Sequence, residues 1–506
     1  MKQKHFPIWQ EGDIMPAFPQ LKENIKTEVT VVGGGITGIT TAYLLAKKGV
    51  KVVLIDRGKL TNATTGHTTA KITAQHGIIY HEFMSHFSHE EAALYYESQS
   101  EALKSIRNII QENQIECHFE EQDAILLTNN DKNRRKLEQE FEAYTALNID
   151  REELTQLPVA FPMKYAIKMK NQAQFHPISY LKSLVDEIIE NGGEIYENTS
   201  AYDIENADHR IVRTKDQHSI ICDQVVIATQ FPFFEGEAFY SARMYPSRSY
   251  AVAFTSKNPY PGGMYLDVDE PVHSLRTLKL DGEEYWIFGG QNHKTGQYKH
   301  DVAPPLQKLK EFASKHLKLT DWQYEWSAQD YTTLDKLPYI GRLNKNRPEI
   351  LVATGYRKWG GMTNSMVAAK VLTDLILNKE NPYIDLYRPT RFHADPDLKQ
   401  FISTNTNVAK ELVSGKLMQD KHTPKEIPAG SAIKTKQHGQ TIGIYKDHEG
   451  KVHALDTTCT HLGCEVTWND EEKTWDCPCH GSRFACDGKV IEGPALEDLK
   501  KVEYRK

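Results

Sequence analysis

Two short cysteine–histidine motifs near the C-terminal end constrain the fold of this chain more than any other feature. The first is Cys459-Thr-His461-Leu-Gly-Cys464, and the second is Cys477-Pro-Cys479-His480-Gly-Ser. The sequence contains seven cysteines, and five of them lie between residues 459 and 486, interleaved with the two histidines. Such crowding indicates a metal site built from two loops. Two thiolates and two imidazoles suit tetrahedral zinc as well as an iron–sulfur cluster, so the ligand types alone leave both open.

The complete pattern, C-T-H-L-G-C followed by C-P-C-H-G-S, resembles that of Rieske [2Fe–2S] proteins. In such proteins two thiolates hold one iron and two neutral imidazoles hold the other. The resemblance implies these cluster ligands: Cys459, His461, Cys477 and His480. It also implies a disulfide between Cys464 and Cys479, as in Rieske proteins of high potential, with two free thiols as the alternative. Cys486 has no place in the pattern and is expected to be a small buried side chain.

Two positions, the last residue of the second motif and one just beyond it, bear on the redox potential. Ser482 matches the serine whose hydroxyl hydrogen-bonds a bridging sulfide in respiratory Rieske proteins. Phe484 stands where those proteins carry a tyrosine that bonds a ligand sulfur. Because the missing hydrogen bond leaves the reduced cluster less stabilised, we expect a moderate rather than a high potential.

A glycine-rich turn near the other end predicts a nucleotide site. The segment Gly33-Gly-Gly-Ile-Thr-Gly38 satisfies G-x-G-x-x-G between an apolar strand and an apolar helix. These glycines allow a tight turn, close approach to a pyrophosphate and close helix packing, and the acidic residue after the next strand is placed to bind a ribose. The predicted contacts are Gly33, Gly35, Ile36, Thr37, Gly38, Asp56 and Arg57. This unit alone does not distinguish FAD from NAD.

The chain from about 25 to 385 resembles the glycine oxidase/D-amino-acid oxidase family of FAD enzymes. The matching stretches are Val29–Gly38 with Asp56, Phe175–Leu181, Val225–Thr229, Thr332–Gly341 and Ala353–Gly361. In that family a late glycine-rich segment passes beside the flavin. The resemblance therefore implies FAD, and further contacts at Thr64, Thr65, Gly66, Thr229, Gly355, Gly360, Gly361 and Met362. Gln230 departs from the family, which usually has glycine there. No second G-x-G-x-x-G follows a strand, so no NAD(P)H site is predicted.

The same resemblance places the substrate beside the flavin. The family oxidises C–N bonds of amino acids or secondary amines by hydride transfer, and a carboxylate there needs a cation. The candidate catalytic residues are Arg276, Lys358 and Lys71, with Arg357 nearby and with Tyr245, Tyr250 and Tyr265 as possible pocket residues. Each has an ordinary structural explanation as well. Some relatives attach the flavin covalently to a histidine, and His67 and His76 are the candidates here; a noncovalent flavin is the alternative.

The predicted architecture has two parts. Residues 1–390 form an α/β unit: a doubly wound FAD-binding fold, from segments near 27–80, 178–232 and 330–380, with an antiparallel substrate sheet between them. A polar linker with room for a short helix covers 391–425, and an all-β Rieske domain covers 426–506. The whole resembles DadA-like FAD oxidoreductases with a C-terminal Rieske domain.

This resemblance implies a dehydrogenase that oxidises a small amine or amino acid and passes electrons through the cluster to an external acceptor, such as a small redox protein or a quinone. The alternatives are a reductase or oxygenase component that receives electrons through the cluster, and a non-catalytic redox sensor. The formal net charge is −7 and no basic stripe is visible, so nucleic acid is not an expected partner. Neither an apolar leader nor an 18-residue apolar run occurs, so we expect a cytoplasmic protein without a membrane span.

Overall fold

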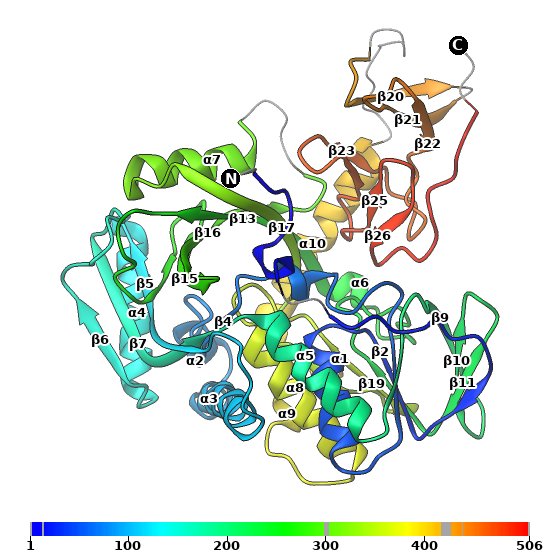
Figure 1. Ribbon diagram of the computed structural model, residues 1–506, viewed down its shortest axis with the longest axis horizontal. Coiled ribbons are helices and arrows are strands. Elements are labelled where there is room, and N and C mark those ends of the chain that lie inside the picture. Colours follow the sequence, from blue (N-terminus) through cyan, green and yellow to red (C-terminus); the bar gives the residue numbers. More distant parts are fainter. Residues whose placement is uncertain (1–2, 13–14, 298–302, 416–426, 438, 504–506) are drawn as a thin grey trace.

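The computed structural model describes residues 3–12, 15–297, 303–415, 427–437 and 439–503. Figure 1 shows a layered region around β2 and β19, a large sheet that contains β13 and β17, and a small module formed by β20 to β26. No helix among these described residues is both long and apolar enough to cross a membrane.

The layered region is built on a six-stranded sheet in the order β18-β19-β12-β2-β3-β8. Its strands are β2 (Val29–Val32), β3 (Val52–Ile55), β8 (Glu194–Tyr196), β12 (Gln224–Ile227), β18 (Tyr339–Asn344) and β19 (Arg347–Thr354). All neighbours run parallel except β18 and β19. The central strands are buried on both faces, which explains their continuous apolar runs.

Helices cover one face of this sheet and a second sheet covers the other. The helices are α1 (Ile36–Ala46), α5 (Pro177–Glu190) and α8 (Gly361–Ile376). The second sheet has the order β1-β11-β10-β9, with β1 (Ile25–Lys26), β9 (Ala201–Asn206), β10 (Arg210–Thr214) and β11 (Ser219–Cys222). Alternate side chains of one strand serve the two layers: Val31 packs in the core with the helices, and Val32 in the core with the second sheet. These layers confirm the predicted FAD-binding α/β fold, with a small sheet in place of helices on its second face.

The large sheet is mainly antiparallel, in the order β17-β13-β16-β15-β14-β5-β7-β4 with β6 beside β7. Its strands are β4 (Lys71–Ile72), β5 (Glu120–Thr128), β6 (Arg151–Leu154), β7 (Tyr165–Gln174), β13 (Met244–Thr255), β14 (Met264–Asp267), β15 (His273–Leu280), β16 (Glu283–Lys294) and β17 (Asp321–Thr333). The remaining helices of this part are α2 (Tyr80–His86), α3 (His89–Glu112), α4 (Asp131–Ala146), α6 (Tyr240–Arg243), α7 (Pro305–Phe312) and α9 (Ile384–Tyr387). The sequence pattern predicts helices near residues 89–114 and 131–147, and α3 and α4 lie there.

The C-terminal module contains two small antiparallel sheets, β20-β21-β22 and β23-β24-β25-β26. The strands are β20 (Ser431–Gln437), β21 (Gln440–Lys446), β22 (Val452–Asp456), β23 (Thr467–Asn469), β24 (Thr474–Asp476), β25 (Arg483–Ala485) and β26 (Val490–Glu492). The fully buried Trp475 packs in the core of this module. A Cβ on Gly443 would stand 2.5 Å from its ring, so the ring packs directly against the backbone of β21. The all-β module expected from the sequence is confirmed.

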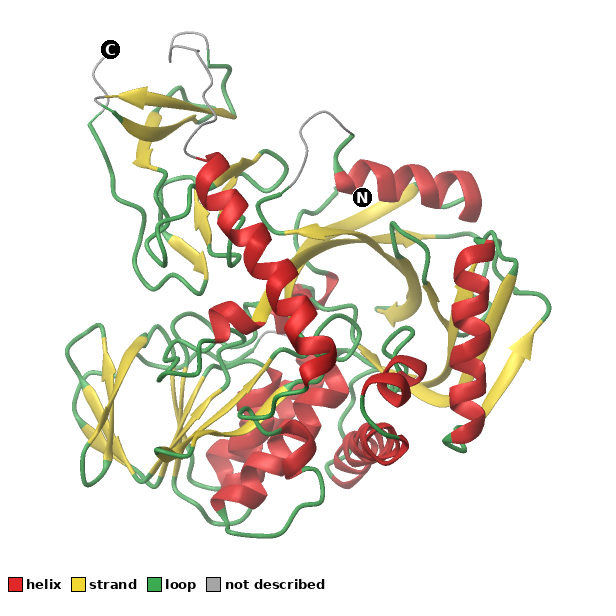
Figure 2. Cartoon of the chain, turned by 180° about the vertical axis from the view of Figure 1, so that it is seen from behind, coloured by secondary structure: helices red, strands yellow, loops and turns green. Residues whose placement is uncertain are grey.

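The predicted linker is in large part a helix. Helix α10 (Ala394–Gly415) occupies most of 391–425, and the end of that segment lies outside the described residues. Val408 and Leu412, one helical turn apart, pack against the core of the C-terminal module. Asn405 Nδ2 donates to the carbonyl oxygen of Ala242 in α6, 3.1 Å away. Figure 2 shows α10 running from the module across the back of the α/β unit, so it packs against both parts.

Candidate functional site

A cavity of about 420 Å³ lies at the carboxyl ends of β2, β3, β12 and β19. Ligands of open α/β sheets bind at this edge. The predicted residues that line it are Gly33, Gly35, Ile36, Thr37, Asp56, Arg57, Thr64, Thr65, Lys71, Thr229, Gly355, Lys358, Gly361 and Met362. Gly38, Gly66, Gly360 and Arg276 are not among the lining residues.

The glycines of the first turn have distinct roles. Gly33 has a φ of +115°, and a Cβ there would stand 2.5 Å from the carbonyl oxygen of Ala228. A Cβ on Gly38 would stand 1.9 Å from the carbonyl oxygen of Gly33, so Gly38 is required for packing beneath the turn. Gly35 begins α1 without a side-chain cap, which leaves backbone amides and the positive end of the helix dipole facing the cavity. This cradle fits a pyrophosphate.

Two predicted contacts also organise the turn itself. Thr65 Oγ1 accepts a hydrogen bond from the Ile36 amide at 3.0 Å. Asp56 Oδ2 accepts from the Gly34 amide and Oδ1 from the Gly58 amide, both at 2.7 Å. Each carboxylate oxygen keeps a further acceptor position, so Asp56 remains able to bind a ribose hydroxyl.

Gln230, which departs from the family pattern, adopts a left-handed backbone conformation. Gln230 has a φ of +64°, a conformation that glycine adopts more easily. Its side-chain amide donates to the carbonyl oxygen of Gln329, and its own carbonyl oxygen accepts from Thr354 Oγ1. The strained residue is thus held by β17 and β19.

Two lysines flank one indole inside the cavity. Lys358 Nζ lies 5.7 Å and Lys71 Nζ 5.4 Å from the centre of the Trp359 ring. Lys71 Nζ donates to the carbonyl oxygen of Tyr265 at 2.7 Å, whereas Lys358 Nζ is buried without a hydrogen-bond partner among the described residues. Burial lowers the pKa of Lys71 to about 7 and that of Lys358 to about 8, the latter despite the nearby Asp330 carboxylate.

The structure gives Arg276 a different position from the one expected. Its guanidinium is 1% exposed and donates to the backbone carbonyl oxygens of Thr69, Ala70, Phe175 and Thr277. These bonds fix the segment that carries Lys71, so Arg276 supports the cavity from behind.

The remaining candidate histidines and tyrosines also divide into residues that line the cavity and residues that do not. His67 and Tyr250 line the cavity, but His76, Tyr245 and Tyr265 do not. His76 is completely buried, hydrogen-bonded to Tyr95 Oη and the Thr73 carbonyl oxygen, and burial lowers its pKa to about 3.

The four predicted cluster ligands come together as a thiol pair and an imidazole pair. Cys459 and Cys477 are buried, and the hydrogen bond between their side chains lowers the pKa of the Cys459 thiol. The rings of His461 and His480 lie 5.1 Å apart at 88°. Burial lowers the pKa of His480 to about 4, so its imidazole is neutral, as metal ligation requires. His461 Nδ1 is buried without a hydrogen-bond partner in the described structure, which fits a nitrogen reserved for a metal.

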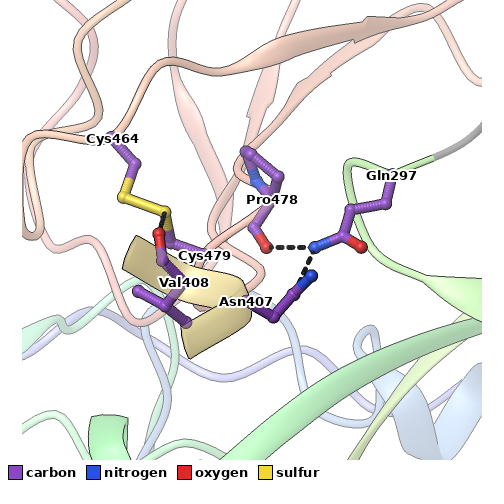
Figure 3. Close-up of a disulfide and its surroundings, with 6 residues drawn as sticks. All are labelled: Gln297, Asn407, Val408, Cys464, Pro478 and Cys479. Carbon is purple, nitrogen blue, oxygen red and sulfur yellow. Dashed lines mark hydrogen bonds between the residues drawn. A yellow bond between two sulfur atoms is a disulfide. The ribbon is translucent and has the colours of Figure 1, made fainter. Parts of the chain in front are cut away.

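A disulfide joins the two cluster loops. Cys464 and Cys479 are bonded, with their Cα atoms 6.5 Å apart. Figure 3 shows α10 beside this bond: the carbonyl oxygen of Val408 lies 3.9 Å from Cys479 Sγ. In the same view Gln297 Nε2 donates to Asn407 Oδ1 at 2.8 Å and to the carbonyl oxygen of Pro478 at 3.1 Å.

The second cluster loop also contacts the wall of the cavity. Tyr331, in β17, lines the cavity, and its Oη donates to the carbonyl oxygens of His480 (3.0 Å) and Gly493 (2.9 Å). Gln329 Nε2 donates to the carbonyl oxygen of Gly481 at 2.9 Å. Phe231 lines the cavity too, with its ring 6.2 Å from that of His461. The imidazole side of the cluster site therefore faces the cavity across one layer of side chains.

Comparison with known families agrees with both sites. The model of the FAD dependent oxidoreductase family matches residues 28–375, more than half of the chain. The chain belongs to this family. A Rieske [2Fe-2S] domain model matches residues 419–503 of the same oxidoreductase. FAD and a [2Fe–2S] cluster are its cofactors, and the glycine cradle and the paired thiols and imidazoles fit them.

Similar proteins support this assignment. The putative Rieske 2Fe-2S iron-sulfur protein YhfW of Bacillus subtilis (strain 168) is 47% identical over 495 residues, covering 98% of this chain and 97% of that protein. Glycine oxidase from Geobacillus kaustophilus superposes with a TM-score of 0.60 at 19% identity, covering 72% of this chain and 99% of that one. L-proline dehydrogenase from P. horikoshii superposes with a TM-score of 0.58 at 17% sequence identity, covering 74% of this chain and 98% of that one. These two structures share the fold of the oxidoreductase.

Several site residues of the oxidoreductase were not predicted from the sequence. Asp330, Tyr331 and Phe231 line the cavity, as do residues between 490 and 498 of the C-terminal module. None lies in a motif. Tyr331 lies where buried and half-buried residues alternate at the end of β17, a pattern that any ordinary strand can show.

Proposed function

We propose that this oxidoreductase is a dehydrogenase for a small amino acid or amine and that its electrons leave through the Rieske cluster to an external acceptor. Bound FAD supplies a two-electron hydride acceptor and the cluster a one-electron carrier, so each C–N bond oxidised to an imine sends two electrons outward, one at a time. The observation that carries the proposal is the shared layer of Phe231 and Tyr331 between the cavity and the cluster histidines.

Lys358 supports a substrate with a carboxylate. Its ammonium lines the cavity and is buried without a hydrogen-bond partner in the described structure. A carboxylate entering the cavity compensates this buried charge with a charge-assisted hydrogen bond. Asp330 lines the same cavity, and its carboxylate is available to accept hydrogen bonds from a substrate amine.

An anaerobic reduction experiment tests the proposal. The holoenzyme is mixed with D- and L-amino acids, N-methyl amino acids, and the matching amines that lack the carboxylate. Flavin absorbance and the EPR signal of the reduced cluster are followed after each addition. We expect flavin bleaching and then the cluster signal, with the carboxylate-bearing member of each pair preferred.

Other outcomes identify the alternatives. Reduction only by a reduced ferredoxin, with the cluster signal preceding flavin bleaching, would show the reverse direction of electron flow. If neither amines nor reduced ferredoxin changes either signal, the module is a sensor or a structural element. If the carboxylate-bearing substrate and its matching amine reduce the flavin at equal rates, the proposed role of Lys358 is wrong.

A further inference from the structure

The cavity extends across the boundary between the α/β unit and the C-terminal module. The module contributes Val490, Glu492, Gly493, Pro494, Leu496 and Asp498 to its lining. The α/β unit contributes Thr199 to Ala201, Lys215, Asp56 and Arg57 at the same end. Asp56 follows the second strand of the nucleotide-binding unit, where the ribose of an adenosine binds in this fold. The module therefore borders the adenosine end of the flavin site.

Contacts with the α/β unit hold this module segment in place. Arg57 donates to the carbonyl oxygen of Ile491, and Lys215 to that of Leu496. Lys215 Nζ also pairs with Glu497 at 3.1 Å. On its inner side the segment is bonded at Gly493 by Tyr331. Residues 490–498 are thus tied to both sides of the cavity opening.

A buried ionic network fixes the module as a whole. Arg248, on β13 and 1% exposed, pairs with Glu472 and Glu492 of the module. Arg483 of the module pairs with the same two carboxylates. Ser327 Oγ, on β17, donates to Glu472 at 2.7 Å. Separation of the module from the sheet would leave buried charges of this network without their partners, which is strongly unfavourable. The network therefore opposes that separation.

The cluster loop and the cavity segment are also joined inside the module. The amide of Ala495 donates to Ser482 Oγ at 3.0 Å, and Ser482 is the last residue of the second cluster motif. Correct folding of residues 490–498 is therefore linked to that of the cluster loop.

We propose that residues 490–498 of the Rieske module form a lid over the adenosine end of the flavin site, so that FAD is retained only while the module is docked. This inference requires that FAD binds in the cavity. It does not depend on the substrate or on the direction of electron flow. The lid can therefore be wrong while the proposed function is right, and the proposed function can be wrong while the lid is right.

The lid is tested with variants at two places. Lys215→Ala removes contacts at the rim of the cavity. Glu472→Gln weakens the ionic network between the module and the sheet, and Glu472 itself neither lines the cavity nor belongs to a cluster motif. Arg213→Ala is the matched control, because Arg213 lies two residues from Lys215 but pairs with Glu205 on the neighbouring strand. Iron and sulfide content establish that each variant keeps its cluster.

Two measurements decide the outcome. The first is the FAD dissociation rate after dilution of the holoenzyme, followed by flavin fluorescence. We expect it to rise at least several-fold in Lys215→Ala and about tenfold or more in Glu472→Gln, and to stay unchanged in Arg213→Ala. The second is amide hydrogen exchange of residues 490–498, which we expect to be faster in both test variants than in the control.

The second measurement keeps the proposal falsifiable if Glu472→Gln does not fold or if the flavin is covalently attached, since it compares Lys215→Ala with Arg213→Ala at full flavin content. Unchanged exchange in residues 490–498 in Lys215→Ala, or faster exchange without faster release of a noncovalent FAD, would overturn the lid.

Discussion

The carbonyl oxygen of His480 lies 3.0 Å from Tyr331 Oη, so a cluster ligand is hydrogen-bonded through its backbone to a residue that lines the flavin cavity. Gly481 is held equally closely, because a Cβ there would stand 2.5 Å from the Pro246 side chain. On the other flank a Cβ on Gly296 would stand 2.6 Å from the Pro478 nitrogen. This close packing leaves the second cluster loop no room to move while the module is docked.

Replacing Tyr331 with phenylalanine tests this relationship. The carbonyl oxygens of His480 and Gly493 lose their donor, and a buried unsatisfied group costs about 1–3 kcal/mol of unfolding free energy. We also expect slower cluster reduction after flavin bleaching, measured by stopped-flow absorbance. Tyr265→Phe is the control. Tyr265 Oη donates to the carbonyl oxygen of Gly262, so this bond stays within the α/β unit and does not reach the module. Equal cluster reduction in both variants would contradict the prediction.

Lys358→Met is expected to lower kcat/KM for a carboxylate-bearing substrate by about 10–100-fold, the value of one hydrogen bond to a charged group. The amine without a carboxylate should lose little. Because the pKa of Lys358 is lowered to about 8, its ammonium is present below that pH and is lost as pH rises through it. The kcat/KM profile should therefore fall above about pH 8, and this limb should be absent in the variant. A variant that keeps the limb would assign it to another group.

Phe484→Tyr is expected to raise the midpoint potential of the cluster. Phe484 is fully buried in β25, next to the second cluster motif. A hydroxyl bonded to a ligand sulfur stabilises the reduced cluster, within the Rieske range of about −150 to +300 mV. Protein-film voltammetry measures the shift, and Phe484→Leu, which adds no donor, provides the comparison. An unchanged potential in Phe484→Tyr would exclude such a bond.

Removal of the disulfide is expected to destabilise the module rather than the α/β unit. A cross-link that closes a loop of this size, with a sequence separation of 15, contributes about 3 kcal/mol. In Cys464→Ser the cluster absorbance should therefore be lost at a lower denaturant concentration than in the wild type. The circular dichroism of the helices, most of which belong to the α/β unit, reports the second transition, because the flavin is expected to leave with the module. Coincident loss of both signals at the wild-type midpoint would show that the bond adds no stability.

Local motifs predicted the parts of the site whose geometry is set by neighbouring residues. Gly33 and Gly35 act within one turn, and the cluster ligands lie within two short loops, so short motifs and the resemblance that they carry locate them. Helix α3 follows from its apolar periodicity for the same reason. These features need no knowledge of distant segments.

The features that were not predicted depend on contacts between distant segments. Arg276 has the chemistry of a carboxylate ligand, but its guanidinium is satisfied by backbone carbonyl oxygens that only the folded sheet brings near. Tyr331 meets His480 across 149 residues. The 391–425 segment is polar overall, and only its docking against the module makes Val408 and Leu412 the buried side of a long helix.

The cavity lining runs from Val32 to Asp498, almost the full length of the polypeptide. During synthesis the glycine turn leaves the ribosome long before the residues that close the cavity, so the flavin has time to enter an open site. Cys459 and Cys477 emerge long after the glycine turn, so we expect iron–sulfur insertion to follow the first contacts of the flavin. If the proposed lid folds only around its cluster, we expect iron shortage to yield molecules that also release their flavin, so that the two cofactors are lost together.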